Sequence, residues 1–162
     1  MKPYSILIVE DHPLQHLYLQ NLLHELGDFM LEAAQDGNEA LERLRQRDFD
    51  LVLTDLLMPG MDGVQFIQSL ATLRCKPALA IMSAASRRML MAASLVAKNL
   101  DVKVIGLISK PVAADALRSL VSQLNHKDRS PSPPPPTAPK IDRHTLIQAM
   151  GSGQIQAWFQ PK

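Results

Sequence analysis

The chain has 162 residues, which is enough for one domain of about 120 residues and an appendage. Its formal net charge of +1 argues against a broad binding surface for nucleic acid or membrane, and its single cysteine excludes an intrachain disulfide framework. The N-terminus lacks the apolar run of a signal peptide, and no apolar segment approaches the roughly 20 residues that span a bilayer. We therefore expect a cytoplasmic protein without membrane or nucleic-acid partners.

Strand-like and helix-like periodicities alternate from the N-terminus onward. Ser5–Val9 is a short apolar run and predicts a buried strand. Leucines at i, i+3, i+4 and i+7 from Leu19 predict one face of a helix that Gly27 ends. A second strand is expected from Phe29, and Asp36 with a glutamate three residues later predicts a capping box at the start of a second helix.

The same alternation continues to residue 125. Strands are expected at Leu51–Thr54, Leu79–Met82 and Val104–Ile108, with helices at Gly63–Leu70 and Arg87–Leu100. A last helix is predicted from apolar residues that share one face: Ala113, Ala116, Leu117, Leu120, Val121 and Leu124. Five strands that alternate with five helices predict an α/β fold, a doubly wound parallel sheet with helices on both faces.

Polar side chains follow the carboxyl ends of four of these strands. Glu10 and Asp11 follow the first strand, Asp55 the third, Ser83 the fourth and Lys110 the fifth. Open parallel sheets bind ligands at this edge, where the strand order reverses. We therefore expect these five residues, which are distant in the sequence, to converge on one site.

The chemistry of these residues indicates a site for phosphate and a divalent cation. Two carboxylates 4 Å apart repel each other by roughly 4 kcal/mol at an effective dielectric constant near 20, and Mg²⁺ bound between them relieves this repulsion. Lys110 and the Ser83 hydroxyl can each donate to phosphoryl oxygens. An aspartate beside Mg²⁺ can attack a phosphoryl donor, which gives an aspartyl phosphate.

Simpler interpretations exist for most of these residues taken singly. Asp11 could cap the first helix, as aspartate commonly does before a helix-starting proline. Ser83 could be an ordinary residue at a strand end, and Lys110–Pro111 a turn. For Asp62–Gly63 we favour the plain interpretation, a turn and a helix start. Asp55 before a loop rich in proline and glycine has few such explanations.

Four motifs stand at the ends of the predicted strands. They are IVEDHP (Ile8–Pro13), TDLLMPGMDG (Thr54–Gly63), MSAAS (Met82–Ser86) and SKP (Ser109–Pro111). In this order, and on these elements, they resemble the bacterial two-component response-regulator receiver domain over residues 2–125. The resemblance implies a flavodoxin-like fold with strand order 2-1-3-4-5, and a phosphoacceptor switch rather than an enzyme.

The resemblance also implies a role for each acid. Asp55 would accept a phosphoryl group from a sensor histidine kinase or a phosphotransfer protein. Asp11, Asp55 and the backbone carbonyl of Leu57 would hold Mg²⁺, with Glu10 acting through a coordinated water. Ser83 would be the switch hydroxyl, and Lys110 would pair with the phosphoryl group ahead of a cis peptide bond to proline.

One position departs from the family pattern. Receiver domains usually carry an aromatic residue three positions before the lysine, where Leu107 stands here. In the absence of that ring, the fourth helix and fifth strand could form a surface for a homodimer or for the output domain directly. Met89, Met91 and Leu95 would supply it, since methionine repacks easily. The alternative is that these residues merely cover the sheet.

The sequence changes character after residue 125. We expect a receiver domain at 1–125 and a proline-rich, extended linker at 126–140. Residues 141–162 resemble the opening of an EAL-type cyclic-di-GMP phosphodiesterase domain, because WFQPK (Trp158–Lys162) is similar to the first strand of that family. The segment stops before the Glu-Ala-Leu signature and the metal ligands, so we expect a truncated output domain without phosphodiesterase activity.

Two other functions use similar residues. Phosphatases of the haloacid-dehalogenase kind carry an acid two residues after the nucleophile, where Leu57 stands here. A pseudo-receiver would have lost an acid or the lysine, whereas Glu10, Asp11, Asp55 and Lys110 are all present. We therefore prefer the phosphorylated receiver.

Overall fold

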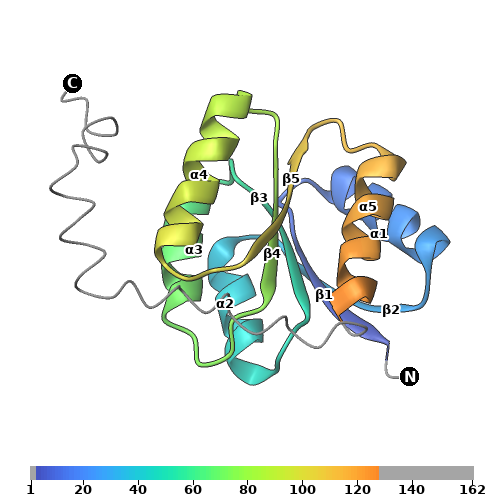
Figure 1. Cartoon of the computed structure of the whole chain (residues 1–162), viewed down its shortest axis with the longest axis horizontal. Coiled ribbons are helices and arrows are strands. Elements are labelled where there is room, and N and C mark those ends of the chain that lie inside the picture. Colours follow the sequence, from blue (N-terminus) through green and yellow to red (C-terminus); the bar gives the residue numbers. More distant parts are fainter. Residues whose placement is uncertain (1–2, 128–162) are drawn as a thin grey trace, which may run out of the picture. The chain divides into compact units, whose positions relative to one another are not determined.

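The computed structural model describes residues 3–127, which form a five-stranded parallel sheet with five helices (Figure 1). The strands are β1 (Tyr4–Val9), β2 (Phe29–Ala34), β3 (Leu51–Asp55), β4 (Ala78–Ser83) and β5 (Val104–Ser109). The helices are α1 (Pro13–Leu26), α2 (Gly37–Gln46), α3 (Gly63–Ala71), α4 (Arg87–Asn99) and α5 (Ala114–Lys127). The sheet order is β2-β1-β3-β4-β5, so the expected doubly wound fold is confirmed.

The predicted ends of these elements differ from the observed ones by a residue or two. Ala113, which we placed on the last helix, comes immediately before α5. Leu100, which we placed on the fourth helix, is its C-cap. The predicted linker at 126–140 falls almost entirely, and the predicted truncated domain at 141–162 entirely, outside the described residues.

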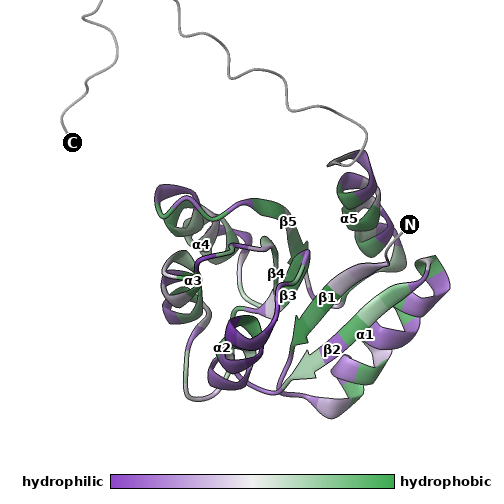
Figure 2. Ribbon diagram, turned by 90° about the horizontal axis from the view of Figure 1, so that it is seen from below, coloured by the Kyte–Doolittle hydropathy of each residue, from purple (hydrophilic) through white to green (hydrophobic). Residues whose placement is uncertain are grey.

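The helices cover both faces of the sheet (Figure 1). Side chains alternate along a strand, so Leu7 and Val9 of β1 pack beneath α2, α3 and α4, whereas Ile6 and Ile8 pack against α1 and α5. Figure 2 shows the consequence, with hydrophobic colour on β1 and hydrophilic colour over much of α2. This double coverage explains why the central strands read as continuous apolar runs.

Aspartate side chains cap the starts of α2 and α3. Asp62 accepts the N–H of Gln65, and the Gln65 side chain accepts the N–H of Asp62, so the plain interpretation of Asp62 as a helix start is confirmed. Asp36 accepts the N–H of Glu39, but the Glu39 carboxylate accepts the N–H of Gln35. The capping box predicted for α2 is therefore only half formed, because its glutamate reaches one residue further back.

Asp11 does not cap α1. His12 occupies the N-cap position without a side-chain capping bond, and Pro13 starts the helix. The interpretation of Asp11 as a helix cap is therefore wrong, and its carboxylate is available to the site.

None of the helices within residues 3–127 has the length and the apolar character that crossing a bilayer requires.

Candidate functional site

Three carboxylates meet where the strand order reverses. Glu10 and Asp11 follow β1, Asp55 ends the neighbouring strand β3, and one oxygen from each residue lies within 4.8 Å of the other two. Glu10 and Asp55 are 2% and 5% exposed, whereas Asp11 is exposed. The strand ends thus bring together the three acids as expected, and two of them are largely removed from water.

Lys110 reaches these acids from the loop after β5. Its Nζ lies 2.5 Å from Asp55 Oδ2, 2.7 Å from Glu10 Oε2 and 2.6 Å from Gln15 Oε1. Burial lowers the pKa of the Lys110 ammonium group, but the hydrogen bonds and charges of Asp55 and Glu10 outweigh burial, and the net result is a raised pKa. Lys110 is therefore a permanent positive charge beside Asp55.

The other oxygen of Asp55 is bound by its own loop. The Leu57 N–H donates to Asp55 Oδ1 at 3.0 Å, and the Leu56 N–H donates to the Met82 carbonyl of β4 at 2.9 Å. The backbone after β3 therefore orients the Asp55 carboxylate before any ligand arrives.

Ser83 also lies at this edge of the sheet, and its hydroxyl is hydrogen-bonded to the backbone that follows β4. It is fully buried at the end of β4, and its Oγ accepts the Ala85 N–H at 2.9 Å. Its carbonyl accepts the Lys110 N–H at 2.9 Å, which fixes the start of the loop that carries the lysine. The peptide bond after Lys110 is cis, as the family resemblance implied.

The donor set fits a hard divalent cation. The three carboxylates and the one ammonium group leave an excess of two negative charges, and carboxylate oxygens are the ligands that Mg²⁺ prefers. Glu10, Asp11 and Asp55 are the residues that could hold the ion.

Leu107 occupies the position where an aromatic residue was expected from the family. It lies on β5 with 41% of its surface exposed, and it borders a hollow of about 350 Å³ whose other walls are Arg87, Leu90, Met91 and Ser109. Met89, Met91 and Leu95 of α4 are also exposed, at 48%, 53% and 61%. The helix covers the sheet through its buried residues Leu90, Ala93 and Ala97, and these three side chains lie on its more exposed face.

Sequence reasoning missed Gln15. Its position in the first turns of α1 fits a solvated residue as well as a site residue, and only the fold places its carboxamide on Lys110. The polar character of a residue four positions after Asp11 is the only signal that could have pointed to it.

Comparison with known proteins decides the family. The model of the response regulator receiver domain matches residues 6–122, which is most of the chain. The chain belongs to the response regulator receiver domain family. It is therefore a receiver of two-component signalling, and receivers of this kind work with histidine kinases and output domains and generally use Mg²⁺.

Relatives of this receiver are found among curated proteins and solved structures. The chemotaxis protein CheY-3 of Vibrio cholerae is 33% identical over 126 residues, which cover 76% of this chain and 92% of that protein. A response regulator from Colwellia psychrerythraea is 25% identical, with a TM-score of 0.65, and the match covers 77% of this chain and 99% of that one. The signal receiver domain of a modulated diguanylate cyclase from Desulfovibrio desulfuricans is 28% identical, with a TM-score of 0.63 and coverage of 79% and 98%.

Proposed function

We propose that this receiver accepts a phosphoryl group on Asp55 from a histidine kinase or a phosphotransfer protein in a Mg²⁺-dependent reaction. One observation carries the proposal: the buried Asp55 carboxylate lies between two further acids and the Lys110 ammonium group, 2.5 Å away. A carboxylate in this setting can act as a nucleophile while the neighbouring positive charges stabilise the incoming phosphate.

In the proposed transfer, an Asp55 oxygen forms a bond to phosphorus as the bond from phosphorus to the histidine nitrogen breaks. The electron pair of that bond stays on the nitrogen, which is then protonated. Mg²⁺, when bound by Asp11, Asp55 and the Leu57 carbonyl, with Glu10 acting through water, supplies positive charge that offsets the acids and the phosphoryl oxygens. Lys110 stabilises the charge on the transferred group, and the backbone N–H of Leu57 keeps the Asp55 carboxylate oriented.

The Ser83 hydroxyl would change its hydrogen-bond partner when Asp55 is phosphorylated. We propose that this hydroxyl leaves the Ala85 N–H and donates to a phosphoryl oxygen, which shifts the loop before α4.

The direct test is intact-mass measurement after incubation with acetyl phosphate. In Mg²⁺ the chain should gain one phosphoryl group, and in excess EDTA it should gain none. The absence of any mass gain in Mg²⁺ would contradict the proposed function.

Removing Asp11 should weaken Mg²⁺ binding by at least tenfold, whereas removing Asp62 should leave it unchanged. Asp11 contributes one oxygen to the acidic cluster, while Asp62 is not a member of that cluster and caps α3. Calorimetric titration of Asp11→Asn and Asp62→Asn with MgCl₂ measures both. Equal losses of affinity in the two variants would show that the ion binds elsewhere.

We further propose that a receiver at 1–125 and a linker at 126–140 lead to an output domain of cyclic-di-GMP signalling in the cytoplasm. The similarity of WFQPK to the opening of EAL-type domains supports this. The Desulfovibrio desulfuricans relative, a receiver of a modulated diguanylate cyclase, also supports it. Phosphorylation of the receiver would then control cyclic-di-GMP hydrolysis by that output domain.

We expect phosphorylation to act through a homodimer or domain-docking surface formed by α4 and β5. Beryllofluoride, a phosphoryl mimic, should raise the weight-average mass in sedimentation, and Leu107→Tyr should change that response because the ring would occupy the hollow beside Met91. Met30→Tyr, at an exposed apolar position on β2, is the matched control and should leave the response to beryllofluoride unchanged. If neither the mimic nor Leu107→Tyr alters association, this surface is not the output face.

A further inference from the structure

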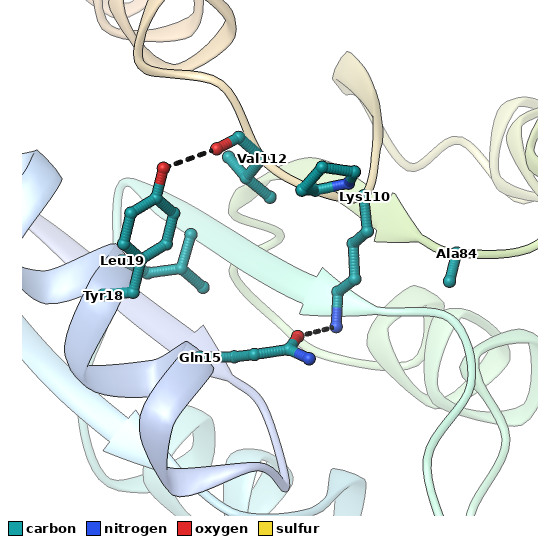
Figure 3. A pocket seen from close by; sticks show the side chains of 7 residues that line it. Gln15, Tyr18, Leu19, Ala84, Lys110 and Val112 are labelled. Atoms are coloured by element: carbon teal, nitrogen blue, oxygen red, sulfur yellow. Dashed lines mark hydrogen bonds between the residues drawn. The ribbon is translucent and has the colours of Figure 1, made fainter.

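Lys110 has a third acceptor besides the two carboxylates. Figure 3 shows the Gln15 side chain reaching from α1 to the Lys110 ammonium group, and the two atoms Oε1 and Nζ are 2.6 Å apart. A lysine ammonium group has three N–H donors. Glu10, Asp55 and Gln15 therefore provide one acceptor for each of them.

Gln15 differs chemically from the other two acceptors. Glu10 and Asp55 belong to the acidic cluster, so on the proposed function their charge is shared with a divalent cation and, at Asp55, with a phosphoryl group. Gln15 is neutral and lies outside that cluster. Its carboxamide oxygen is therefore the one of these three acceptors that carries no formal charge and is not part of the acidic cluster.

The loop that carries Lys110 is bound to α1 at a second point. The Tyr18 hydroxyl, one turn after Gln15, donates to the Val112 carbonyl at 2.9 Å (Figure 3). Between these two contacts lies a hollow of about 380 Å³ with an apolar wall formed by Leu19 and Pro111. Packed side chains therefore do not fill the space beside Lys110. The position of its ammonium group depends on the hydrogen bonds to Glu10, Asp55 and Gln15.

We propose that Gln15 is a positioning residue for phosphoryl transfer, which holds the Lys110 ammonium group beside Asp55 through the reaction. The proposal rests on the proposed function. It assigns to α1 a part in the reactivity of the site beyond its packing against the sheet. The contact that links Gln15 to the site is its hydrogen bond to the Lys110 ammonium group, so on this proposal its effect passes through Lys110.

A double-mutant cycle tests that dependence. Gln15→Leu removes the acceptor at similar size and should slow phosphorylation by acetyl phosphate and Mg²⁺ about tenfold, as expected for a lost hydrogen bond to a charged group. In a Lys110→Met background, assayed at high donor concentration, the same change should have no further effect. Gln20→Leu, further along α1 and not an acceptor of Lys110, is the matched control and should react at the wild-type rate.

A second measurement needs neither metal nor phosphorylation. In protein labelled with ¹⁵N-lysine, the protons of the Lys110 ammonium group should exchange with water several-fold faster in Gln15→Leu than in the wild type. Gln15→Glu retains an oxygen acceptor and should restore slow exchange. Lys110→Met assigns the signal.

Unchanged proton exchange in Gln15→Leu would overturn the proposal, and so would a full tenfold loss of rate that persists in the Lys110→Met background. Failure of the proposed function looks different. The wild type would then gain no phosphoryl group at all, although exchange at Lys110 would still respond to Gln15.

Discussion

Asp55→Asn should abolish phosphorylation by acetyl phosphate and leave the fold intact. The substitution keeps the size of the side chain but removes the negative oxygen that would attack phosphorus. Lys110 retains Glu10 and Gln15 as acceptors, so no buried charge is left without a partner. Intact mass gives the first result, and urea unfolding monitored by circular dichroism gives the second.

Asp62→Asn is the matched control for this experiment. Asp62 is an exposed aspartate seven residues further along, and asparagine preserves its helix cap. It should be phosphorylated like the wild type. Undiminished phosphorylation of Asp55→Asn would show that another residue is the acceptor, and loss of phosphorylation in both variants would point to a disturbed loop.

Gly63→Ala is expected to destabilise the receiver by about 2 kcal/mol. A Cβ at this position would lie 2.6 Å from Leu56 Cδ1 and 2.8 Å from both the Cα and the carbonyl oxygen of Leu56. Alanine gains about 1 kcal/mol in helix propensity, but a clash with backbone forces the whole loop after Asp55 to move, and overpacking of this kind outweighs the gain. Urea denaturation measures the loss, and slower phosphorylation should accompany it because the Leu57 N–H would shift from Asp55.

Gly27→Ala provides the comparison. Its Cβ would approach the Phe29 ring at 3.4 Å, an ordinary contact, and the backbone of Gly27 is extended. Its stability should therefore stay within about 0.5 kcal/mol of the wild type. If Gly63→Ala is no less stable than Gly27→Ala, the close approach of α3 to Leu56 does not constrain the loop.

Local patterns in the sequence were sufficient for most of the architecture. Apolar periodicity located five strands and five helices, because burial on a sheet or along a helix repeats with a fixed period. The meeting of Glu10, Asp11 and Asp55 also followed from the sequence, since residues after parallel strands share one edge of the sheet. Periodicity did not determine which strands are neighbours, and the order came from the resemblance to receivers.

Side-chain partners were decided only by the tertiary structure. The sequence allowed Asp11 to cap α1 and Glu39 to complete a capping box, but backbone geometry at each helix start decided otherwise. The polar character of Gln15 did not by itself indicate a contact with Lys110, 95 positions away, and nothing in the sequence indicated that Gly63 lies against Leu56. Contacts of this kind depend on strand register and loop path, which bring residues within a few ångströms irrespective of their spacing along the chain.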